Sequence, residues 1–298
     1  MSTREFPPNF SIQENILLAD FTNIKIGGLT DFLSIVKDQN IFISLYRYCR
    51  EIGLPFLALG DGTNVFFPES GYRGLVAIIK FDKVSTIRGG AIVVEAGASL
   101  DQIRYECIEH GLTGFEFASG IPGSIGGAVY GNAGAHGSDM ADSLKMAEIL
   151  HKVNGKEFWP VEKLAFEYRS SILKRGKMPC VVLSATFTAV RKSREEAWEK
   201  IQTFQEHRKK TQPPGASMGS IFKNPPGDYA GRLIEAAGLK GHRVGRAMIS
   251  PQHANFIINM KGASAQDIWH LIRIAQETVH DKFGIHLEPE IEMLGAYK

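Results

Sequence analysis

The chain has 298 residues, 44% of them hydrophobic and 22% charged, and its formal net charge is +2. This composition is typical of a folded protein with two or three lobes, and it excludes an intrinsically disordered chain. The weak charge, without a basic stripe that carries interleaved aromatic residues, gives no support for a nucleic-acid partner.

Cysteine usage and the lack of long apolar runs bear on the compartment. Cys49, Cys107 and Cys180 show no CxxC spacing and lie among apolar residues, which is typical of buried thiols in a reducing compartment. The first eight residues hold no apolar signal core, and runs such as 180–190 are too short to cross a bilayer. We therefore expect a cytoplasmic protein with no membrane association.

In chain order, the first elements alternate between strand and helix patterns. An amphipathic segment at 12–18 and a turn at 22–28 precede a strand at 31–36. A helix is predicted over 41–52, because Gly53 and Pro55 form a typical stop signal, and a buried strand follows at 56–59.

The first glycine turn, Gly60-Asp61-Gly62-Thr63-Asn64, comes directly after this strand. Two glycines in this place are part of a dinucleotide-binding fingerprint, but the third glycine position holds Val65 and Phe66-Phe67-Pro68 stands where a helix should begin. The sequence therefore argues against a Rossmann fold and favours a phosphate-binding turn.

Strand patterns continue at 75–80, 84–88 and 91–95. Ser99 then caps a predicted helix, with Gln102 as its capping-box partner and Gly111 at its end.

The stretch from Ser119 to Gly137 is rich in glycine, which recurs at 120, 123, 126, 127, 131, 134 and 137. Because glycine carries a large entropic cost in regular structure, we expect neither a helix nor a strand here. Backbone N–H groups that point inward would suit a phosphate or diphosphate. The alternative is a flexible surface loop, which the apolar residues between the glycines disfavour.

The second half alternates again. Asn154-Gly155 predicts a hairpin between strands at 147–152 and 157–161. The later expected elements are a strand at 179–190, a charged linker helix at 193–210, a helix at 230–237, strands at 246–249 and 254–259, a helix capped by Ser264 and Asp267 with the buried stripe Ile268, Leu271, Ile272, Ala275 and Val279, and a last strand at 286–294.

Six motifs in this order resemble the UDP-N-acetylenolpyruvoylglucosamine reductase family, and the resemblance extends from about Thr22 to Gly295. They are Ser119–Gly137, Tyr168–Ser171, Gly219–Pro225, Ala236–Gly241, His253–Phe256 and Leu287–Glu290.

The resemblance implies an α+β fold, with a two-lobed FAD-binding module of the vanillyl-alcohol-oxidase/PCMH type followed by an α+β substrate-binding domain. The implied divisions are residues 1–75 and 76–192 for the two FAD-binding lobes and 193–298 for the substrate-binding domain, whose last strand returns to the active site. FAD would be bound non-covalently and NADPH would be the hydride donor. The expected reaction reduces UDP-N-acetylglucosamine enolpyruvate to UDP-N-acetylmuramate for peptidoglycan, with a small nucleotide sugar as substrate and no obligate protein partner.

Site residues follow by motif matching. Arg169, Ser220 and Glu290 match the catalytic positions, and Tyr130, Lys223, Asn224 and His253 match substrate-binding positions. No metal is expected, because the histidines lack ligand spacing. The expected cofactor-binding residues are Gly60, Asp61, Gly62, Thr63, Asn64, Ser119, Gly120, Ile121, Pro122, Gly123, Ser124, Gly126, Gly127, Asn132, Ala133 and Gly134.

The residue types suit this chemistry, although each also has a structural interpretation. A guanidinium such as that of Arg169 binds a carboxylate in a bidentate fork. Ser220 is a proton donor only if it touches the reacting carbon, and by itself such a serine is more often a helix cap. Glu290 alternates with apolar residues in 287–293, which puts it on one strand face. Pro289 would equally suit a solvated edge strand.

Two departures from the family pattern stand out. Asp61 and Thr63 occupy positions where glycine and serine are usual, and a carboxylate near a diphosphate is unfavourable unless it points away. No long insertion with a tyrosine lies between Ser171 and Cys180, so the chain resembles the subclass without that loop. The other functions considered are a different FAD oxidoreductase of this fold that acts on a sugar or alcohol, and a non-catalytic flavin- or nucleotide-sugar-binding protein.

Overall fold

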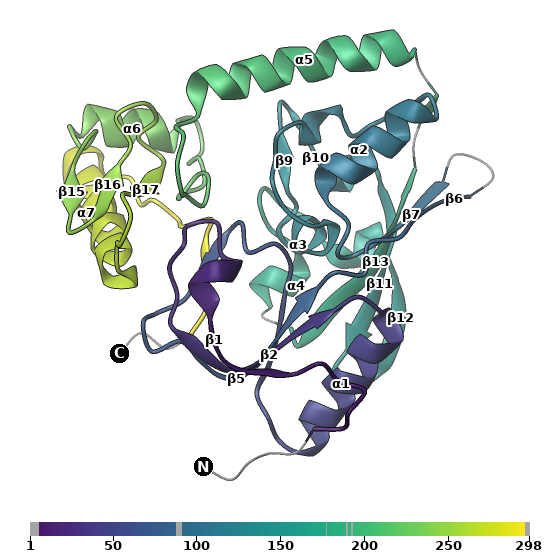
Figure 1. Ribbon diagram of the computed structural model, residues 1–298. Helices are drawn as coiled ribbons and strands as arrows, with labels where there is room; N and C mark the ends of the chain where they lie inside the picture. The colour runs from purple at the N-terminus through teal and green to yellow at the C-terminus, as the bar shows by residue number, and fades with distance from the viewer. Residues whose placement is uncertain (1–5, 88–90, 177, 189, 192, 296–298) are drawn as a thin grey trace. The chain divides into compact units, whose positions relative to one another are not determined.

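The computed structural model describes residues 6–87, 91–176, 178–188, 190–191 and 193–295 (Figure 1). They form two compact units, each assembled from separate stretches of the chain. The first unit takes residues 1–12, 33–61 and 75–208, and the second takes residues 13–32, 62–74 and 209–298. The chain therefore passes from one unit to the other several times, twice in the middle of a strand.

An antiparallel sheet of five strands is the centre of the first unit (Figure 1). Its core joins apolar residues of the sheet to those of the helices α2 (Leu100–Glu109) and α3 (Ile125–Gly131). In sheet order the strands are β12 (Gly155–Pro160), β11 (Leu144–His151), β13 (Cys180–Thr188), β7 (Ala91–Glu95) and β6 (Val84–Ile87).

A second layer of the first unit is formed by α1 (Gln39–Glu51) and β3 (Phe56–Leu59). The ring of Phe42 on α1 makes edge contacts with Phe56 and Phe81, and Asp38 caps the helix through its carboxylate. β3 pairs in parallel with residues 75–78 of β5 (Tyr72–Ile79). The unit also holds α4 (Ile172–Arg175), the two-stranded pairs β9 (Gly134–Ala135) with β10 (Ser138–Asp139) and β8 (Leu112–Thr113) with β14 (Val190–Arg191), and most of α5 (Arg194–Thr211).

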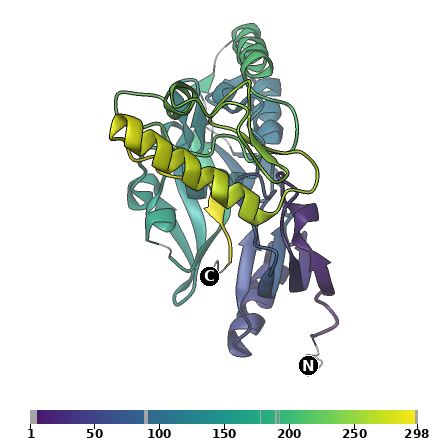
Figure 2. The ribbon, with the colours of Figure 1, turned by 90° about the vertical axis from the view of Figure 1, so that its left-hand side faces the viewer.

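The second unit has its core around α7 (Ala265–Phe283), which Figure 2 shows lying lengthwise within this unit. Its predicted cap and stripe are confirmed: Ser264 and Asp267 form a capping box, and all five stripe residues are buried. The unit also contains α6 (Ala230–Ala236), the sheet β15 (Arg243–Val244), β16 (Ala247–Ile249), β17 (Ile257–Asn259), the parallel pair β4 (Val65–Phe66) with β18 (Glu292–Met293), β1 (Gln13–Leu17) and the start of β2 (Leu29–Val36).

N-terminal residues complete the core of the second unit. Ile24, Ile26 and Phe66 are buried against apolar residues of α6 and α7. The amide of Asn259 donates to the carbonyl of Ile24 at 2.8 Å across 235 positions of sequence. The late α+β part of the chain is thus joined within its unit to residues near the start.

Three sequence expectations were wrong. The glycine-rich stretch contains the helix α3, because Gly126 lets its backbone approach Ala96 while Ile125, Ala128 and Val129 are buried. The predicted strand at 286–294 is reduced to β18, because Pro289 cannot continue a ladder and forms only an isolated bridge to Phe222. The strand at 254–259 begins only at Ile257, after a turn.

Smaller differences concern element ends. The segment at 12–18 is the strand β1 followed by a short 3-10 helix. Ser99 caps α2 as expected, since its hydroxyl accepts from the N–H of Gln102. The Gln102 side chain donates to the carbonyl of Asp82 instead of accepting from the N–H of Ser99, as the predicted capping box would require. Arg88, at the end of a predicted strand, lies outside the described residues.

Replacing Glu148 with alanine should destabilise the first unit by about 1.5–3 kcal/mol, the range for hydrogen bonds to a charged group. The Glu148 side chain, on β11, accepts hydrogen bonds from Gln39 at 2.9 Å and Ser184 at 3.1 Å and pairs with Lys156 at 2.6 Å. Urea unfolding at neutral pH measures the loss, and Glu199→Ala, at an exposed position of α5, is the control.

The contribution of Glu148 should also depend on pH. Burial acts to raise the pKa of Glu148, but the hydrogen bonds and the charge of Lys156 outweigh it and lower that pKa. Because the folded pKa is below the unfolded one, the stabilisation is present above the unfolded value, about 4.3, and is lost as pH falls through the folded value. A difference between wild type and Glu148→Ala that stays constant into acid would contradict this assignment.

Candidate active site

The two predicted phosphate-binding segments meet in the first unit. A Cβ placed on Gly60 would lie 2.2 Å from Oγ of Ser124, so the end of β3 touches the glycine-rich stretch. Ser124 is itself buried and bridges to Ser99, at the cap of α2. The close approach of the Ser124 side chain to the backbone at position 60 leaves room only for glycine there, and it fits a cradle for a phosphate-containing cofactor.

Asp61 is neutralised by a lysine that sequence spacing did not point to. Nζ of Lys80, at the end of β5, lies 2.6 Å from the Asp61 carboxylate. The carboxylate that seemed unfavourable beside a diphosphate is thus engaged by a cation of the same unit.

The rest of the first turn belongs to the second unit. Gly62 adopts φ of +63°, and a Cβ there would lie 1.9 Å from the carbonyl oxygen of Phe21, so only glycine fits. Asn64 donates from its side chain to the carbonyl of Glu290 at 3.2 Å and accepts from the backbone N–H of Glu292 at 2.9 Å. The turn is therefore bonded to the segment that carries Glu290.

Polar side chains within the glycine-rich stretch support the stretch itself. Oγ of Ser119 donates to the carbonyl of Glu116 at 2.7 Å. Asn132 adopts a left-handed backbone after α3 and its amide bonds to Asp139, to the carbonyl of Glu167 and to the N–H of Ala141. These contacts leave the backbone of the stretch as the more suitable cofactor ligand.

Ile121, Pro122 and Gly123 form the turn before α3, and Gly127, Ala133 and Gly134 follow within or after that helix. Gly120 approaches the side chain of Arg208, since a Cβ on it would lie 3.1 Å from Nε. Thr63 is half-buried in the turn of the second unit.

Arg169 is held against the glycine-rich stretch. It lies in a turn closed by two 3.0 Å backbone hydrogen bonds between Glu167 and Ser170, and it has a left-handed φ of +54°. Its guanidinium donates to the carbonyl of Gly134 and lies 4.9 Å from the ring of Tyr168. The half-buried position suits a group that is fixed in place and still able to reach a ligand.

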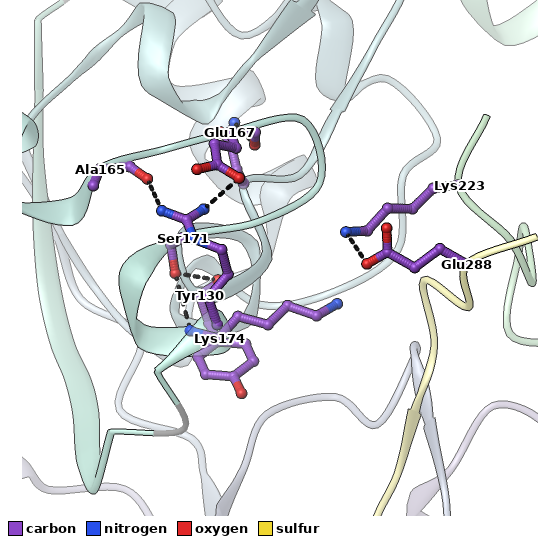
Figure 3. Close-up of polar contacts among 9 residues, drawn as sticks. Tyr130, Ala165, Glu167, Ser171, Lys174, Lys223 and Glu288 are labelled. Carbon is purple, nitrogen blue, oxygen red and sulfur yellow. Dashed lines mark hydrogen bonds and ion pairs between the residues drawn. The ribbon is translucent and has the colours of Figure 1, made fainter. Parts of the chain in front are cut away.

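Further hydrogen bonds fix the surroundings of Arg169. Oγ of Ser171, the cap of α4, donates to the carbonyl of Tyr130 at 2.6 Å (Figure 3). The partly buried ring of Tyr130 packs against the core of the first unit. Figure 3 also shows Glu167, whose carboxylate forms an ion pair with the guanidinium of Arg175 at 3.1 Å.

Ser220 and Glu290 lie on neighbouring segments of the second unit. The N–H of Glu290 donates to the carbonyl of Ile221 at 2.8 Å, and the N–H of Lys223 donates to the carbonyl of Glu288 at 2.9 Å. Ser220 precedes the buried residues Ile221 and Phe222 and is itself half-buried. The structure thus brings together two of the three residues predicted to be catalytic.

The predicted substrate-binding residues of the second unit have protein partners. Lys223 forms an ion pair of 2.7 Å with the exposed carboxylate of Glu288 (Figure 3). Asn224 accepts from the N–H of Ala230, at the start of α6. His253 accepts at Nδ1 from the N–H of Asn255, and burial lowers its pKa, so its ring is neutral at pH 7.

The predicted residues are divided between the units. Arg169 and Tyr130 belong to the first unit, and Ser220, Glu290 and the other substrate-binding residues belong to the second. Lys80 and Asn255 were not predicted as site residues, although Asn255 lies within the motif His253–Phe256. Each contacts a residue that is distant in sequence, Asp61 for Lys80 and Phe222 for Asn255, and no local pattern predicts such a pairing.

Two expected absences can be examined in the part of the chain that the structure describes. There, no group of three or more His, Cys, Asp or Glu side chains is arranged to hold a metal ion. No described helix combines the length and apolar character needed to span a bilayer.

Comparisons with known proteins match both halves of the chain. Residues 209–294 match the family model for the C-terminal domain of UDP-N-acetylenolpyruvoylglucosamine reductase, and residues 31–159 match an FAD binding domain. The UDP-N-acetylenolpyruvoylglucosamine reductase of Caldanaerobacter subterraneus subsp. tengcongensis is 42% identical over 92% of this chain and 90% of its own length. The protein of the same name from Bacillus subtilis is 38% identical over 94% of this chain and 92% of its own length.

A solved structure agrees in fold as well as in sequence. The crystal structure of UDP-N-acetylenolpyruvylglucosamine reductase from Thermus caldophilus aligns with a TM-score of 0.82 and 34% identity, over 96% of this chain and 100% of that one.

Proposed function

Because the chain belongs to the UDP-N-acetylenolpyruvoylglucosamine reductase family, we propose how its own residues carry out the family's reaction. The protein is an FAD-dependent oxidoreductase of α+β fold, with an FAD-binding module of the vanillyl-alcohol-oxidase/PCMH type. It uses NADPH to reduce UDP-N-acetylglucosamine enolpyruvate to UDP-N-acetylmuramate in peptidoglycan synthesis. The observation that carries this function is the match to the Caldanaerobacter reductase at 42% identity over 92% of the chain.

Residues 1–75 and 76–192 would form the two FAD-binding lobes, and residues 193–298 the substrate-binding domain. The contact between Gly60 and the side chain of Ser124 supports this for the cofactor, since it brings both glycine segments together. Bound FAD would supply the hydride transfer between NADPH and the enol ether of the nucleotide sugar. The segments 60–64 and 119–134 hold the diphosphate through backbone N–H groups.

Arg169 stabilises the negative charge that develops on the substrate carboxylate. Hydride adds to the terminal carbon of the enolpyruvyl group, and the π electrons of the double bond move to form an enolate of the carboxylate. A guanidinium fixed beside Gly134 can hold that charge without reorganising. The left-handed backbone of Arg169 supports this positioning role, as does the hydrogen bond from Asn132 to the carbonyl of Glu167 in the same turn.

Ser220 gives its hydroxyl proton to the carbon next to the carboxylate, which completes the new C–H bond. Glu290, on the segment bonded to Ile221, is the second donor that returns a proton to the serine. The backbone contact between the two segments supports a relay between these residues.

Lys223, Asn224, His253 and Tyr130 would bind the nucleotide sugar. The diphosphate of the substrate competes with Glu288 for the ammonium group of Lys223, and exposure of Glu288 makes this exchange inexpensive. The proposed substrate is a small nucleotide sugar. The chain also resembles the family subclass that lacks the tyrosine-bearing loop. A cytoplasmic location agrees with the three cysteines, which form no disulfide.

The function is tested by following the flavin spectrum under anaerobic conditions. NADPH should bleach the bound flavin, and the enolpyruvyl sugar nucleotide should then restore the oxidised spectrum. Protein that binds no flavin, or flavin that a sugar or alcohol bleaches and NADPH does not, would contradict the proposal. The second outcome would favour another oxidoreductase of this fold.

Lys80→Ala should weaken FAD binding by roughly fivefold, about 1 kcal/mol, because Asp61 then places an uncompensated charge in the diphosphate turn. Fluorescence titration of the apoprotein with FAD measures the affinity. The double variant Lys80→Ala/Asp61→Gly should return to near wild-type affinity. A single variant with unchanged affinity would show that Asp61 points away from the cofactor.

A further inference from the structure

The side chain of Asn255 makes paired hydrogen bonds with the backbone of one residue, Phe222. Its Oδ1 accepts from the N–H of Phe222 at 3.0 Å, and its Nδ2 donates to the carbonyl of Phe222 at 2.8 Å. The main-chain carbonyl of Asn255 accepts from Ile221 at 2.8 Å. Asn255 is only 3% exposed, so these bonds form away from solvent. The amide of Asn255 thus pairs with the segment that follows Ser220 in the way that the backbone of a neighbouring strand would.

The opposite edge of the same segment is bonded to the segment of Glu290. Ile221 accepts there from the N–H of Glu290, and Lys223 donates to Glu288. The side chains of Ile221 and Phe222 are buried at 1% and 2% exposure, so they cannot slide along the core. Ser220 therefore emerges from a short segment that Asn255 fixes on one side and Glu290 on the other.

We propose that Asn255 is a positioning residue for proton transfer: it fixes the backbone of residues 221–222 so that Ser220 and Glu290 keep the geometry that the transfer needs. The inference rests on the proposed role of Ser220. The amide suits this pairing, because its oxygen accepts from the N–H of Phe222 while its nitrogen donates to the carbonyl of the same residue. A displacement of about 1 Å costs roughly 10²-fold in a positioned reaction, so the loss of either bond should act on the protonation step.

The test is Asn255→Asp, studied as the FAD-containing holoenzyme by anaerobic stopped-flow. A protonated carboxyl can still donate to the carbonyl of Phe222 while accepting from its N–H, whereas a carboxylate can only accept. Burial beside that carbonyl raises the pKa of the introduced carboxyl. Reoxidation by the enolpyruvyl substrate, relative to wild type at each pH, should fall by about 10-fold to 10²-fold as pH rises from about 5 to 9.

Other titrating groups near this segment are common to both proteins. His253 contacts the N–H of Asn255, and Lys223, Glu288 and Glu290 lie on the segment or on its bonded neighbour. Taking the ratio of variant to wild type at each pH removes their contribution. Asn255→Leu should be slow in reoxidation at every pH, and flavin reduction by NADPH should stay near wild type in both variants.

Asn259→Asp is the matched control. Asn259 is also buried, at 7% exposure, and its amide likewise accepts from a backbone N–H, that of Ala263, and donates to a carbonyl, that of Ile24. It should lose stability without a pH-dependent loss of reoxidation.

Equal pH dependence in Asn255→Asp and Asn259→Asp, or equal slowing of both half-reactions, would overturn the proposal. Ser220→Ala shows which proposed role fails, that of Ser220 or that of Asn255. If reoxidation is normal in Ser220→Ala, the proposed role of Ser220 fails. If it is slow there and unaffected in both Asn255 variants, only the role of Asn255 fails.

Discussion

Ser220→Ala should slow reoxidation of the enzyme by the enolpyruvyl substrate by roughly 10²–10⁴-fold, the range for loss of a general acid. Reduction by NADPH should remain near the wild-type rate, because no carbon is protonated in that half-reaction. The structure makes the change local: Ser220 is half-buried, and the bonds that hold its segment come from Ile221, Phe222 and Lys223. Anaerobic stopped-flow absorbance of the flavin resolves the two halves.

Two further variants sharpen this experiment. Ser220→Cys, with its more acidic thiol, should recover part of the rate, whereas Ser217→Ala removes a half-buried hydroxyl from the same loop and should leave both halves unchanged. If both halves slow equally in Ser220→Ala, the serine positions the flavin or the nicotinamide. If neither slows, the proton comes from Glu290 or from water.

Arg169→Met should slow reoxidation by the enolpyruvyl substrate, because it raises the activation free energy of that half-reaction by about 3–4 kcal/mol, the cost of losing one oxyanion donor. The methionine keeps much of the aliphatic packing but cannot donate to the carbonyl of Gly134 or to the substrate carboxylate. FAD content and flavin reduction should not change. Arg169→Lys should recover little, because an ammonium cannot reproduce the bidentate fork.

Arg175→Met is the control for charge and packing in this region. Arg175, on α4, binds the carbonyl of Ala165 and the carboxylate of Glu167, so it contacts the same turn and has no role in the proposed chemistry. It should alter stability and leave reoxidation intact. Loss of flavin in Arg169→Met would instead show that its contact with Gly134 is needed to build the cofactor site.

Local signals predicted the elements that local interactions determine. The helix after Ser264 has its cap and its buried stripe within one stretch of sequence, and the structure contains both. The hairpin at Asn154-Gly155 is likewise present, as β11 and β12. The helix α3 could not be predicted in this way, because Gly126 is favoured by close contact with Ala96, which lies outside the helix.

The candidate site divides along the same line. Arg169, Ser220 and Glu290 were found only through their motifs, since an arginine, a serine and a glutamate have many structural uses. Lys80 and Asn255 act through partners 19 and 33 positions away, and no local pattern carries such a pairing. Their roles depend on which backbones the fold brings together.

The bond from Asn259 to Ile24, 235 positions apart, has a consequence for synthesis on the ribosome. Residues 13–32 leave the exit tunnel well before α6 and α7, whose apolar residues pack with Ile24 and Ile26 in one core. Contacts so distant in sequence carry a large loop-closure entropy and form late. The segment 13–32 must therefore wait, with its apolar side chains uncovered, until α6 and α7 have been synthesised, and during that interval it is a natural target for chaperones.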